Sequence, residues 1–193
     1  INGIEGTGKT TFAENLVNYL NSNNFTALHI SVDGFHFNKA HRYKQGRDSA
    51  KGYYEDSYNE LAFVEKVLKL SQADVPSYIS ATHDLESDNY LTLEAKEIAA
   101  NTIIVTDGAY LFKPVYREYW DLKIYLKTDF KTALLRGVKR DLSSFGNEKD
   151  TIEKFEKRYH SSSKIYLKEV NPESFADIII DNTNLSEIIV LKS

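Results

Sequence analysis

The stretch GIEGTGKT, residues Gly3 to Thr10, decides how the rest of the chain is read. It fits the pattern G-x-x-x-x-G-K-[ST], and Thr11 follows it directly. In such a loop the backbone turns tightly and presents its N–H groups to phosphate oxygens. The pattern alone occurs by chance, but here it lies between the end of an apolar strand and the start of a helix. That context favours a phosphate-binding loop whose helix adds its positive N-terminal dipole.

The loop predicts ATP and Mg²⁺ as ligands. Lys9 is expected to reach the β- and γ-phosphates, and the Thr10 hydroxyl to ligate Mg²⁺. The residues expected to hold the nucleotide are Gly3, Glu5, Gly6, Thr7, Gly8, Lys9, Thr10 and Thr11. Only residues 1–3 represent the strand that precedes such a loop, so we expect the sequence as given to begin inside that strand.

Segments with strand-like and helix-like patterns alternate along the rest of the chain. Apolar or β-branched runs typical of strands lie at 25–32, 102–105, 122–126 and 176–181. Helical spacing of apolar residues is seen at 10–20, 61–70, 130–142 and, in a more charged form, 151–170. Strands separated by helices form right-handed βαβ units with a parallel sheet covered on both faces. We therefore expect a single α/β domain over residues 1–193, of P-loop NTPase type with a five-stranded parallel sheet.

Two stretches fall outside this alternation. Residues 36–56 are polar, aromatic and basic without a clean period, which predicts a surface loop or short helix. Three residues of this stretch are cationic: Arg42, Lys44 and Arg47. Their side chains either attract an anionic substrate or simply face water. Residues 78–82 and 90–93 alternate in hydrophobicity around the polar HDLESDN, which predicts a hairpin. The tyrosines at 53, 54 and 58 are expected mainly to pack.

Composition narrows the class of protein. The 193 residues are 41% hydrophobic and carry a net charge of −4, which does not favour a nucleic-acid binder. There are no cysteines, so disulfides are excluded, and no histidine pair has zinc-ligand spacing. No apolar run approaches the roughly 18 residues of a membrane span. We expect a cytoplasmic protein that acts on a small molecule, without nucleic acid or membrane as a partner.

Two apolar runs end in Asp-Gly. Asp33 follows the strand-like run at 25–32, and Asp107 follows the run at 102–105. Ligands of open parallel sheets bind at the carboxyl ends of the strands, so both carboxylates should face the phosphate loop. They could accept a proton and hold a metal, although Asp-Gly is also a common turn. Phe35 and His36 should stand at the same crevice, either contacting a flat substrate ring or anchoring the loop.

Three stretches carry a resemblance to a known family: SVDGFHFNKAHRYKQGRDSAKGYYEDSYN, TDGAYLFKPVYREYWDLKIYL and KIYLKEVNPESFADIIIDNTN. Together with the phosphate loop they resemble the bacterial uridine kinase-like family. That family belongs to the uridine kinase, phosphoribulokinase and pantothenate kinase group of P-loop kinases. The likeness runs in order from the loop to about Asn184. The phosphate loop is common to many enzymes, whereas the D-G-F-H segment and the A-D-I-I-I-D-N-T ending are more specific.

The resemblance implies roles for individual residues. Asp33 falls where the group has its catalytic aspartate, which accepts the proton of the attacking hydroxyl. Asp107 falls where related kinases have an acid near Mg²⁺. Arg140 matches an arginine that meets the phosphates as they transfer. Tyr78 and His83 match residues that hold the base in uridine-cytidine kinases.

The chain also departs from the family. A lid is expected around residues 143–163, but SSFGNEKD offers only Lys149 where animal enzymes carry clustered arginines. The positive charge of the lid could instead come from Lys157, Arg158 or Lys164. We count Arg158 among the residues expected to contact the substrate. The acid that binds ribose has no unambiguous match, with Asp56 nearest and Asp48 a rival.

The sequence thus favours ATP- and Mg²⁺-dependent transfer of a phosphoryl group to the hydroxyl of a small molecule, most directly the 5′-hydroxyl of uridine or cytidine. The same chemistry on pantothenate or a sugar is the nearest alternative. A nucleotide-dependent switch is an alternative of another class, although no N/T-K-x-D guanine-reading motif is present. A member that binds nucleotide without catalysis is disfavoured because Lys9, Thr10, Asp33 and Asp107 are intact. Related uridine kinases form tetramers, so a homo-oligomer is an open expectation.

Overall fold

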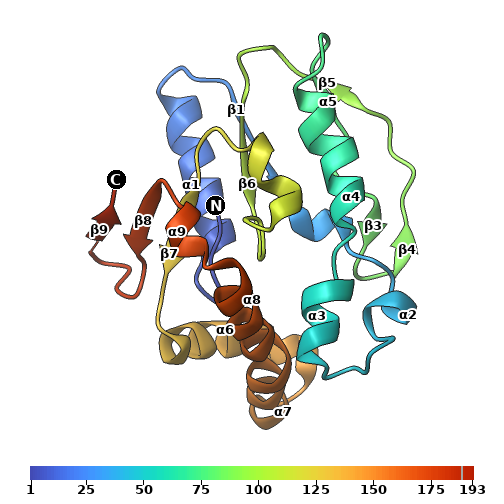
Figure 1. The fold of residues 1–193 in the computed structure, drawn as a ribbon, viewed down its shortest axis with the longest axis vertical. Coiled ribbons are helices and arrows are strands. Elements are labelled where there is room, and N and C mark those ends of the chain that lie inside the picture. The colour runs from blue at the N-terminus through green and yellow to red at the C-terminus, as the bar shows by residue number, and fades with distance from the viewer. Residues whose placement is uncertain (188) are drawn as a thin grey trace.

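In the computed structural model, which describes residues 1–187 and 189–193, short parallel strands form the centre of the molecule (Figure 1). β1 (Ala27–Ser31) pairs in parallel with β6 (Ile103–Asp107), so that Ser31 lies opposite Asp107. β7 (Ile124–Lys127) pairs in parallel with β8 (Ile178–Asp181), and β9 (Ile189–Lys192) adds an antiparallel edge. The four parallel strands lie where the apolar runs predict them.

The predicted five-stranded parallel sheet is not confirmed as one ladder. The strands form a pair, β1–β6, and a triple, β7–β8–β9. The gap between them is filled by the first residues of the chain. Asn2 makes single parallel bridges to Gly108 and to Tyr125, and its N–H donates to the Ile124 carbonyl at 2.8 Å. After Asn2 the chain enters the phosphate loop at Gly3.

Helices cover both faces of these strands. On one face α1 (Lys9–Ser22) packs Phe12 and Leu16 against Leu126 and Ile180. The opposite face carries the larger core, in which half of the buried side chains are aromatic. Helical segments cover this side: α3 (Ala50–Asp56), α4 (Glu60–Phe63) with its π-helical continuation Val64–Leu68 and α5 (Lys69–Ser71), and α8 (Ser161–Val170).

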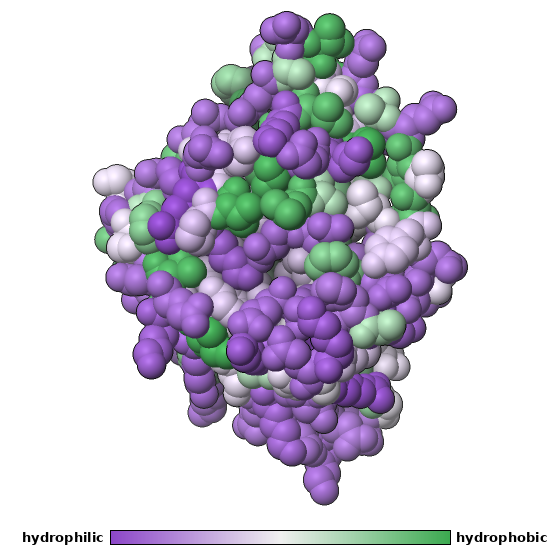
Figure 2. All heavy atoms as spheres, turned by 45° about the vertical axis from the view of Figure 1, so that its right-hand side comes forward, coloured by the Kyte–Doolittle hydropathy of each residue, from purple (hydrophilic) through white to green (hydrophobic). Residues whose placement is uncertain are grey.

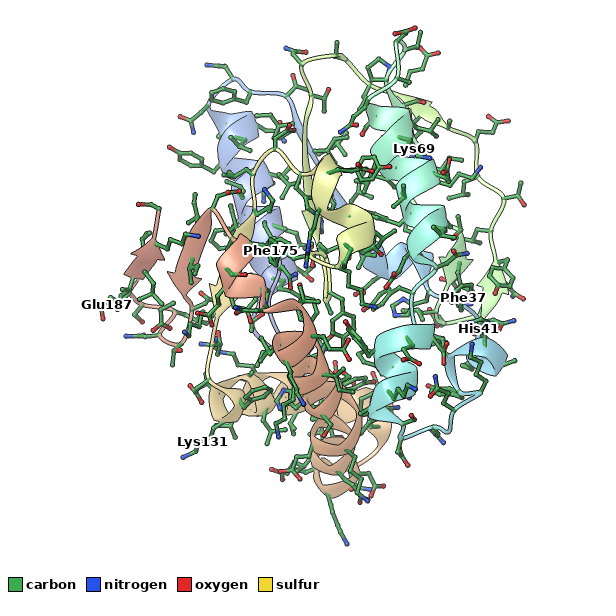
Figure 3. The ribbon with its side chains drawn as sticks, in the orientation of Figure 1. Phe37, His41, Lys69, Lys131, Phe175 and Glu187 are labelled. Atoms are coloured by element: carbon green, nitrogen blue, oxygen red, sulfur yellow. The ribbon has the colours of Figure 1, made fainter. Side chains whose placement is uncertain are left out.

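Short elements connect these layers. They are the 3₁₀ turns Val32–Phe35 and Pro114–Tyr119, α2 (Lys39–Arg42) and α9 (Pro172–Phe175). The region 36–56 was expected to hold a loop or a short helix, and it contains both α2 and α3. Each of these helices begins at a side-chain cap: Asn38 accepts from the His41 N–H, and Ser49 accepts from the Gly52 N–H. The His41 ring stacks on Phe37 with centroids 3.9 Å apart, as Figure 3 shows beside α2.

The hairpin differs in register from the prediction. β3 (His83–Asp84) pairs with β4 (Asn89–Tyr90), inside the stretch expected to be the loop, while β2 (Ser77–Tyr78) pairs with β5 (Lys96–Glu97). The turn is tight because Asp84 accepts hydrogen bonds from the N–H and hydroxyl of Ser87. Asp88 then adopts a left-handed φ of 58°. Local hydrogen bonds of polar residues therefore determine the turn more than the apolar alternation does.

The segment expected to form a lid is helical. α6 (Phe130–Phe145) ends at Gly146, and α7 (Glu148–Lys154) continues through the π-helical Phe155–His160 into α8. Figure 2 shows hydrophilic side chains covering the lower end of the molecule, where α7 lies in Figure 1. None of the described helices is long and apolar enough to cross a membrane.

Candidate active site

The phosphate loop connects Asn2 to α1 and depends on two glycines with left-handed backbone. Gly6 and Gly8 have φ of 89° and 90°. A Cβ on Gly6 would lie 2.1 Å from the Ala133 carbonyl oxygen, so the loop approaches α6 too closely for a side chain. No side chain caps α1 at Gly8, which leaves the first N–H groups of the helix available to a ligand. This end of α1 is therefore built to receive an anion.

Lys9 folds back across the loop. Its Nζ donates to the Ile4 carbonyl at 3.0 Å and lies 3.9 Å from Oε2 of Glu5, and the residue is only 8% exposed. Two more contacts fix the loop. The side-chain amide of Asn182 donates to the Thr7 carbonyl at 2.6 Å, and the His160 ring nitrogen lies 3.1 Å from the Glu5 carbonyl. The loop is thus held by His160, which directly precedes α8, and by Asn182, which directly follows β8.

Asp107 lies at the carboxyl end of β6, in hydrogen-bond contact with the start of α1. The Thr10 hydroxyl donates to its Oδ2 at 2.6 Å, and Nε2 of His29 lies 2.7 Å from its Oδ1. Burial opposes the charge of Asp107, but hydrogen bonds from His29, Thr10 and Ser31 lower its pKa. The carboxylate is therefore ionised at neutral pH, and its bond with His29 raises the pKa of that histidine.

These oxygens suit a magnesium ion. Mg²⁺ prefers oxygen donors and is usually held by one or two protein groups together with substrate phosphates. A hydroxyl and a carboxylate side by side at a phosphate loop match that donor set. The described residues contain no group of three or more histidine, cysteine or acidic side chains placed to enclose a metal. Thr10 and Asp107 could therefore supply oxygen ligands to such an ion.

Asp33 projects from the 3₁₀ turn after β1 and is exposed to the cavity described below. The Tyr58 hydroxyl donates to its Oδ1 at 3.1 Å, and Nδ1 of His36 lies 2.7 Å from its carbonyl. Enclosure by the surrounding protein raises the pKa of Asp33, and the charges of Glu5 and Asp107 add to this rise. Burial likewise lowers the pKa of His36, so its ring is neutral at pH 7.

One cavity of about 930 Å³ joins these groups. The phosphate loop crosses it, with Asp33 and Asp107 on its wall. Beside Thr7 and Gly8 it is lined by residues that neither pattern nor resemblance singled out: Arg136, Asn182 and Leu185. Beside Asp33 it is lined by His36, Arg42, Tyr53, Tyr58 and Leu85. The loop therefore divides the cavity into two ends of different chemistry.

Most of the predicted site residues meet in this cavity. Glu5, Lys9, Thr10, Thr11, Asp33, His36, Asp107 and Arg140 all line it, together with Gly6, Thr7 and Gly8. Arg140 is paired with its neighbour Asp141, with Nε and one terminal nitrogen 2.6 and 2.8 Å from the two carboxylate oxygens. Gly3 lies behind the loop, where a Cβ would meet the Leu126 carbonyl oxygen at 2.6 Å.

Four substrate candidates lie outside the cavity lining. Phe35 is fully buried and packs edge-to-face on Phe63 with centroids 5.0 Å apart. Tyr78 packs at the edge of the main core. His83 is 2% exposed beneath the hairpin, with Nε2 3.2 Å from an oxygen of Asp88. Each of these side chains contacts the scaffold around the cavity.

The fourth, Arg158, joins the helix α7–α8 to the loop before α3. Its guanidinium lies 4.9 Å from the ring centroids of both Tyr43 and Tyr53. It donates to the carbonyls of Arg47 at 2.8 Å, Ser49 at 3.3 Å and Arg42 at 3.4 Å. At 2% exposure it is one of the largest buried side chains of the protein. Its contacts connect the expected lid with the segment before α3 and with Tyr53, which lines the cavity.

Sequence reasoning missed several residues of the cavity. Tyr53 and Tyr58 were expected to pack, and they do, but their hydroxyls also hold Glu5 and Asp33. Asn182 directly follows a buried strand, as Asp33 and Asp107 do, and that position was the available signal for it. Arg136 donates to the carbonyls of Asn182 and Thr183 at 2.7 and 2.8 Å. No local pattern marks a residue whose role depends on contacts so distant in the chain.

Comparison with known proteins agrees with this geometry. The sequence model described as Phosphoribulokinase / Uridine kinase family matches residues 1–188. A uridine kinase of Leuconostoc citreum is 25% identical over 186 residues, covering 93% of this chain and 84% of that protein.

Two solved structures share the fold. One described as a possible uridine kinase from Bacillus stearothermophilus superimposes with a TM-score of 0.67 at 20% identity, over 92% of this chain and 84% of that one. Phosphoribulokinase from Rhodobacter spheroides gives a TM-score of 0.55 at 19% identity, over 95% and 72%. With a family match across nearly its whole length, and a phosphate loop meeting acidic strand ends, the chain is a kinase that belongs to the phosphoribulokinase and uridine kinase family.

Proposed function

We propose that this protein transfers the γ-phosphoryl group of ATP to a primary hydroxyl of a small molecule, most directly the 5′-hydroxyl of uridine or cytidine. The observation that carries the proposal is the meeting of the phosphate loop, the Thr10–Asp107 pair and Asp33 in one cavity. These are the groups needed to bind a triphosphate, to hold its metal and to accept a hydroxyl proton.

The donor occupies the end of the cavity beside Thr7 and Gly8. Its triphosphate lies on the loop, where the free N–H groups and the dipole of α1 favour negative charge. Arg136, Asn182 and Leu185, which also line the cavity, would hold its base. Lys9 exchanges its hydrogen bond with the Ile4 carbonyl for one with phosphate oxygens. A lysine ammonium gains more from a phosphate anion than from a neutral carbonyl, so nucleotide binding drives this exchange.

Thr10 and Asp107 would hold Mg²⁺, directly or through water. When bound, the metal neutralises charge on the β- and γ-phosphates. His29 keeps the Asp107 carboxylate in place through its 2.7 Å contact, on the side of the carboxylate away from Thr10.

Asp33 is the proposed general base. Tyr58 fixes its Oδ1, and Oδ2 is left to accept the proton of the acceptor hydroxyl. Its raised pKa makes it a better proton acceptor than an ordinary aspartate, provided that it is ionised. The acceptor lies in the end of the cavity formed by His36, Arg42, Tyr53 and Leu85. Arg140, released from Asp141, would stabilise the transferring phosphoryl group as the segment 143–163 closes and excludes water.

A coupled assay of ADP release tests this proposal. The protein is given ATP and Mg²⁺ with uridine, cytidine, the other nucleosides, pantothenate and several sugars, each in turn. Stimulation by uridine or cytidine supports the full proposal. Stimulation by pantothenate or a sugar supports phosphoryl transfer to a small molecule but contradicts a nucleoside as the acceptor. Hydrolysis that no acceptor changes would favour a nucleotide-dependent switch.

A further inference from the structure

Glu5 is an unusual residue to find inside a phosphate loop. A carboxylate there repels the polyanion that the loop binds, unless the side chain turns away from it. The structure turns it toward α3, where the Tyr53 hydroxyl donates to Oε1 at 3.0 Å. The side chain is 13% exposed and lines the end of the cavity that holds Asp33 and Tyr58. Glu5 therefore faces the acceptor end while its backbone belongs to the donor end.

Glu5 and Asp33 are held in the same way. In each pair a buried tyrosine donates to one carboxylate oxygen, Tyr53 to Glu5 and Tyr58 to Asp33. Burial raises the pKa of both tyrosines well above 10, so both hydroxyls keep their protons. The two rings pack edge-on with centroids 6.4 Å apart, which fixes the pairs relative to one another.

Each pair leaves one oxygen free. No described residue hydrogen-bonds Oδ2 of Asp33 or Oε2 of Glu5, and Lys9, at 3.9 Å from Oε2, is too far for a hydrogen bond. The acceptor end of the cavity thus presents a second carboxylate oxygen beside that of the proposed base.

The other acids near the cavity are already engaged. Asp107 uses both oxygens on Thr10 and His29, and Asp141 uses both on Arg140. Asp56, the nearest but not an unambiguous match to the acid that binds ribose in the family, lies outside the cavity lining with Lys44 and Gln45 each 2.7 Å from it. Asp48, its rival, is exposed and also lies outside the lining. Glu5 is left as the carboxylate that can take that role.

A second feature of the same end indicates a polar ligand. Arg42 lines the cavity and is 9% exposed, and its Nε lies buried without a hydrogen-bond partner among the described residues. Its terminal nitrogen is held by Asp88 at 3.3 Å. A buried guanidinium N–H without a partner costs free energy. The acceptor end therefore presents carboxylate acceptors at Glu5 and Asp33, with the cation of Arg42 in the same lining.

We propose that Glu5 determines acceptor specificity by accepting a hydrogen bond from a second hydroxyl of the acceptor, while the reacting hydroxyl lies against Asp33. The inference rests on the proposed kinase function and deepens it, because it names the acceptor class as a polyol, such as the ribose of a nucleoside or a free sugar. Tyr53 is a positioning residue that fixes the Glu5 carboxylate.

Substrates that lack one hydroxyl test this proposal. Uridine, 2′-deoxyuridine and 3′-deoxyuridine are compared as acceptors for the wild type and for Glu5→Ala, Glu5→Gln and Tyr53→Phe. The wild type should prefer uridine over one deoxy analogue by about 10- to 100-fold in kcat/KM, the range of a hydrogen bond to a charged group. Glu5→Ala should lower that ratio to within about 3-fold and Glu5→Gln should keep part of it, with each ratio measured at saturating ATP.

Tyr54→Phe is the matched control. Tyr54 neighbours Tyr53 on α3, but Nζ of Lys113 lies 4.0 Å from its ring centroid and it does not line the cavity. Tyr53→Phe should reduce the hydroxyl preference while Tyr54→Phe leaves it unchanged. An unaltered preference in Glu5→Ala, or equal use of all three nucleosides by the wild type, would overturn the role of Glu5.

A binding measurement separates this inference from the proposed function. Saturation-transfer NMR detects uridine, D-ribose and D-fructose bound to the wild type and to Glu5→Ala without any turnover. Absence of ADP release with every acceptor would refute the kinase proposal. Polyol binding that Glu5→Ala abolishes would still support the Glu5 site. Absence of polyol binding, or equal binding by both proteins, would refute that site even in an active kinase.

Discussion

Tyr58 donates a 3.1 Å hydrogen bond to Oδ1 of Asp33, from a position 25 residues further along the chain. The bond leaves the other oxygen of Asp33 directed to the cavity and favours the ionised form of the carboxylate. It links the segment between α3 and α4 to the turn after β1. The position and the proton affinity of the proposed base therefore both depend on this tyrosine.

Asp33→Asn should abolish transfer while keeping nucleotide binding. The amide cannot accept the hydroxyl proton, and general bases contribute about 10²- to 10⁴-fold to rate. We expect kcat to fall by about that factor with the Kd for ATP unchanged, measured by steady-state kinetics and by titration calorimetry. Turnover close to the wild-type rate would exclude Asp33 as the base.

The same substitution should stabilise the protein at neutral pH. Asp33 has a raised pKa in the folded state, so it binds its proton more tightly there than in the unfolded chain. Its ionisation therefore opposes folding, a penalty absent below the ordinary pKa of 3.8 and complete above the raised one. Thermal unfolding should show a higher Tm for D33N at pH 7, with the difference shrinking as the pH falls toward 4. A D33N variant less stable than wild type at pH 7 would contradict the raised pKa.

Tyr58→Phe should move the acid limb of the pH–rate profile. Loss of the donor removes a hydrogen bond to the charged form, so the pKa of Asp33 rises further. The acid limb of kcat/KM, where Asp33 becomes protonated, should therefore shift to higher pH. Tyr54→Phe, an adjacent buried tyrosine outside the cavity, should leave the limb in place. An unshifted acid limb in Y58F would show that Tyr58 does not influence the pKa of the base.

Gly6→Ala should damage both folding and nucleotide binding. Its φ of 89° strains an L-residue, and its Cβ would lie 2.1 Å from the Ala133 carbonyl oxygen. Strain of about 1–2 kcal/mol from the backbone adds to about 1–3 kcal/mol from overpacking. Gly46→Ala is the control, because its φ is 100° but nothing lies within 4 Å of the added carbon. Urea unfolding should therefore show a larger loss for G6A than for G46A, and equal losses would contradict the close approach of the loop to α6.

Arg158→Leu should destabilise the fold. The substitution leaves carbonyls of the loop before α3 without their donor and removes a cation from between two tyrosine rings. We expect a loss of about 2–3 kcal/mol in the free energy of unfolding, since each buried group left unpaired costs about 1–3 kcal/mol. Lys157→Ala, an exposed neighbour paired with Glu153, should leave stability unchanged. If R158L is as stable as K157A and only the KM of the acceptor rises, Arg158 binds substrate instead.

Local patterns predicted the positions of those candidate site residues whose placement depends on neighbours in the sequence. The phosphate loop is contained in eight residues, and its glycine and lysine spacing carries its geometry. Asp33 and Asp107 were predicted to converge because each ends a strand, and their strands prove to be paired directly, with Ser31 opposite Asp107. Strand periodicity and topology suffice for such predictions.

Contacts between distant residues escaped prediction. The bond of Tyr53 to Glu5 joins positions 48 apart, and the contact of His29 with Asp107 joins positions 78 apart. Phe35 and His36 were given the same alternatives, yet the 3₁₀ turn sends Phe35 into the core and His36 to the cavity. Arg158 was considered for its charge, but three backbone carbonyls and two aromatic rings hold it inside the protein. Tertiary packing decides each of these placements.

Transfer of labelled phosphate tests the central claim most directly. The wild type and D33N are incubated with γ-labelled ATP, Mg²⁺ and uridine or cytidine, and the products are separated and identified by mass. We predict labelled nucleoside 5′-monophosphate in amounts equal to the ADP formed by the wild type, and at least about 100-fold less with D33N. Release of labelled inorganic phosphate at the same rate with and without any acceptor of the panel would contradict the account.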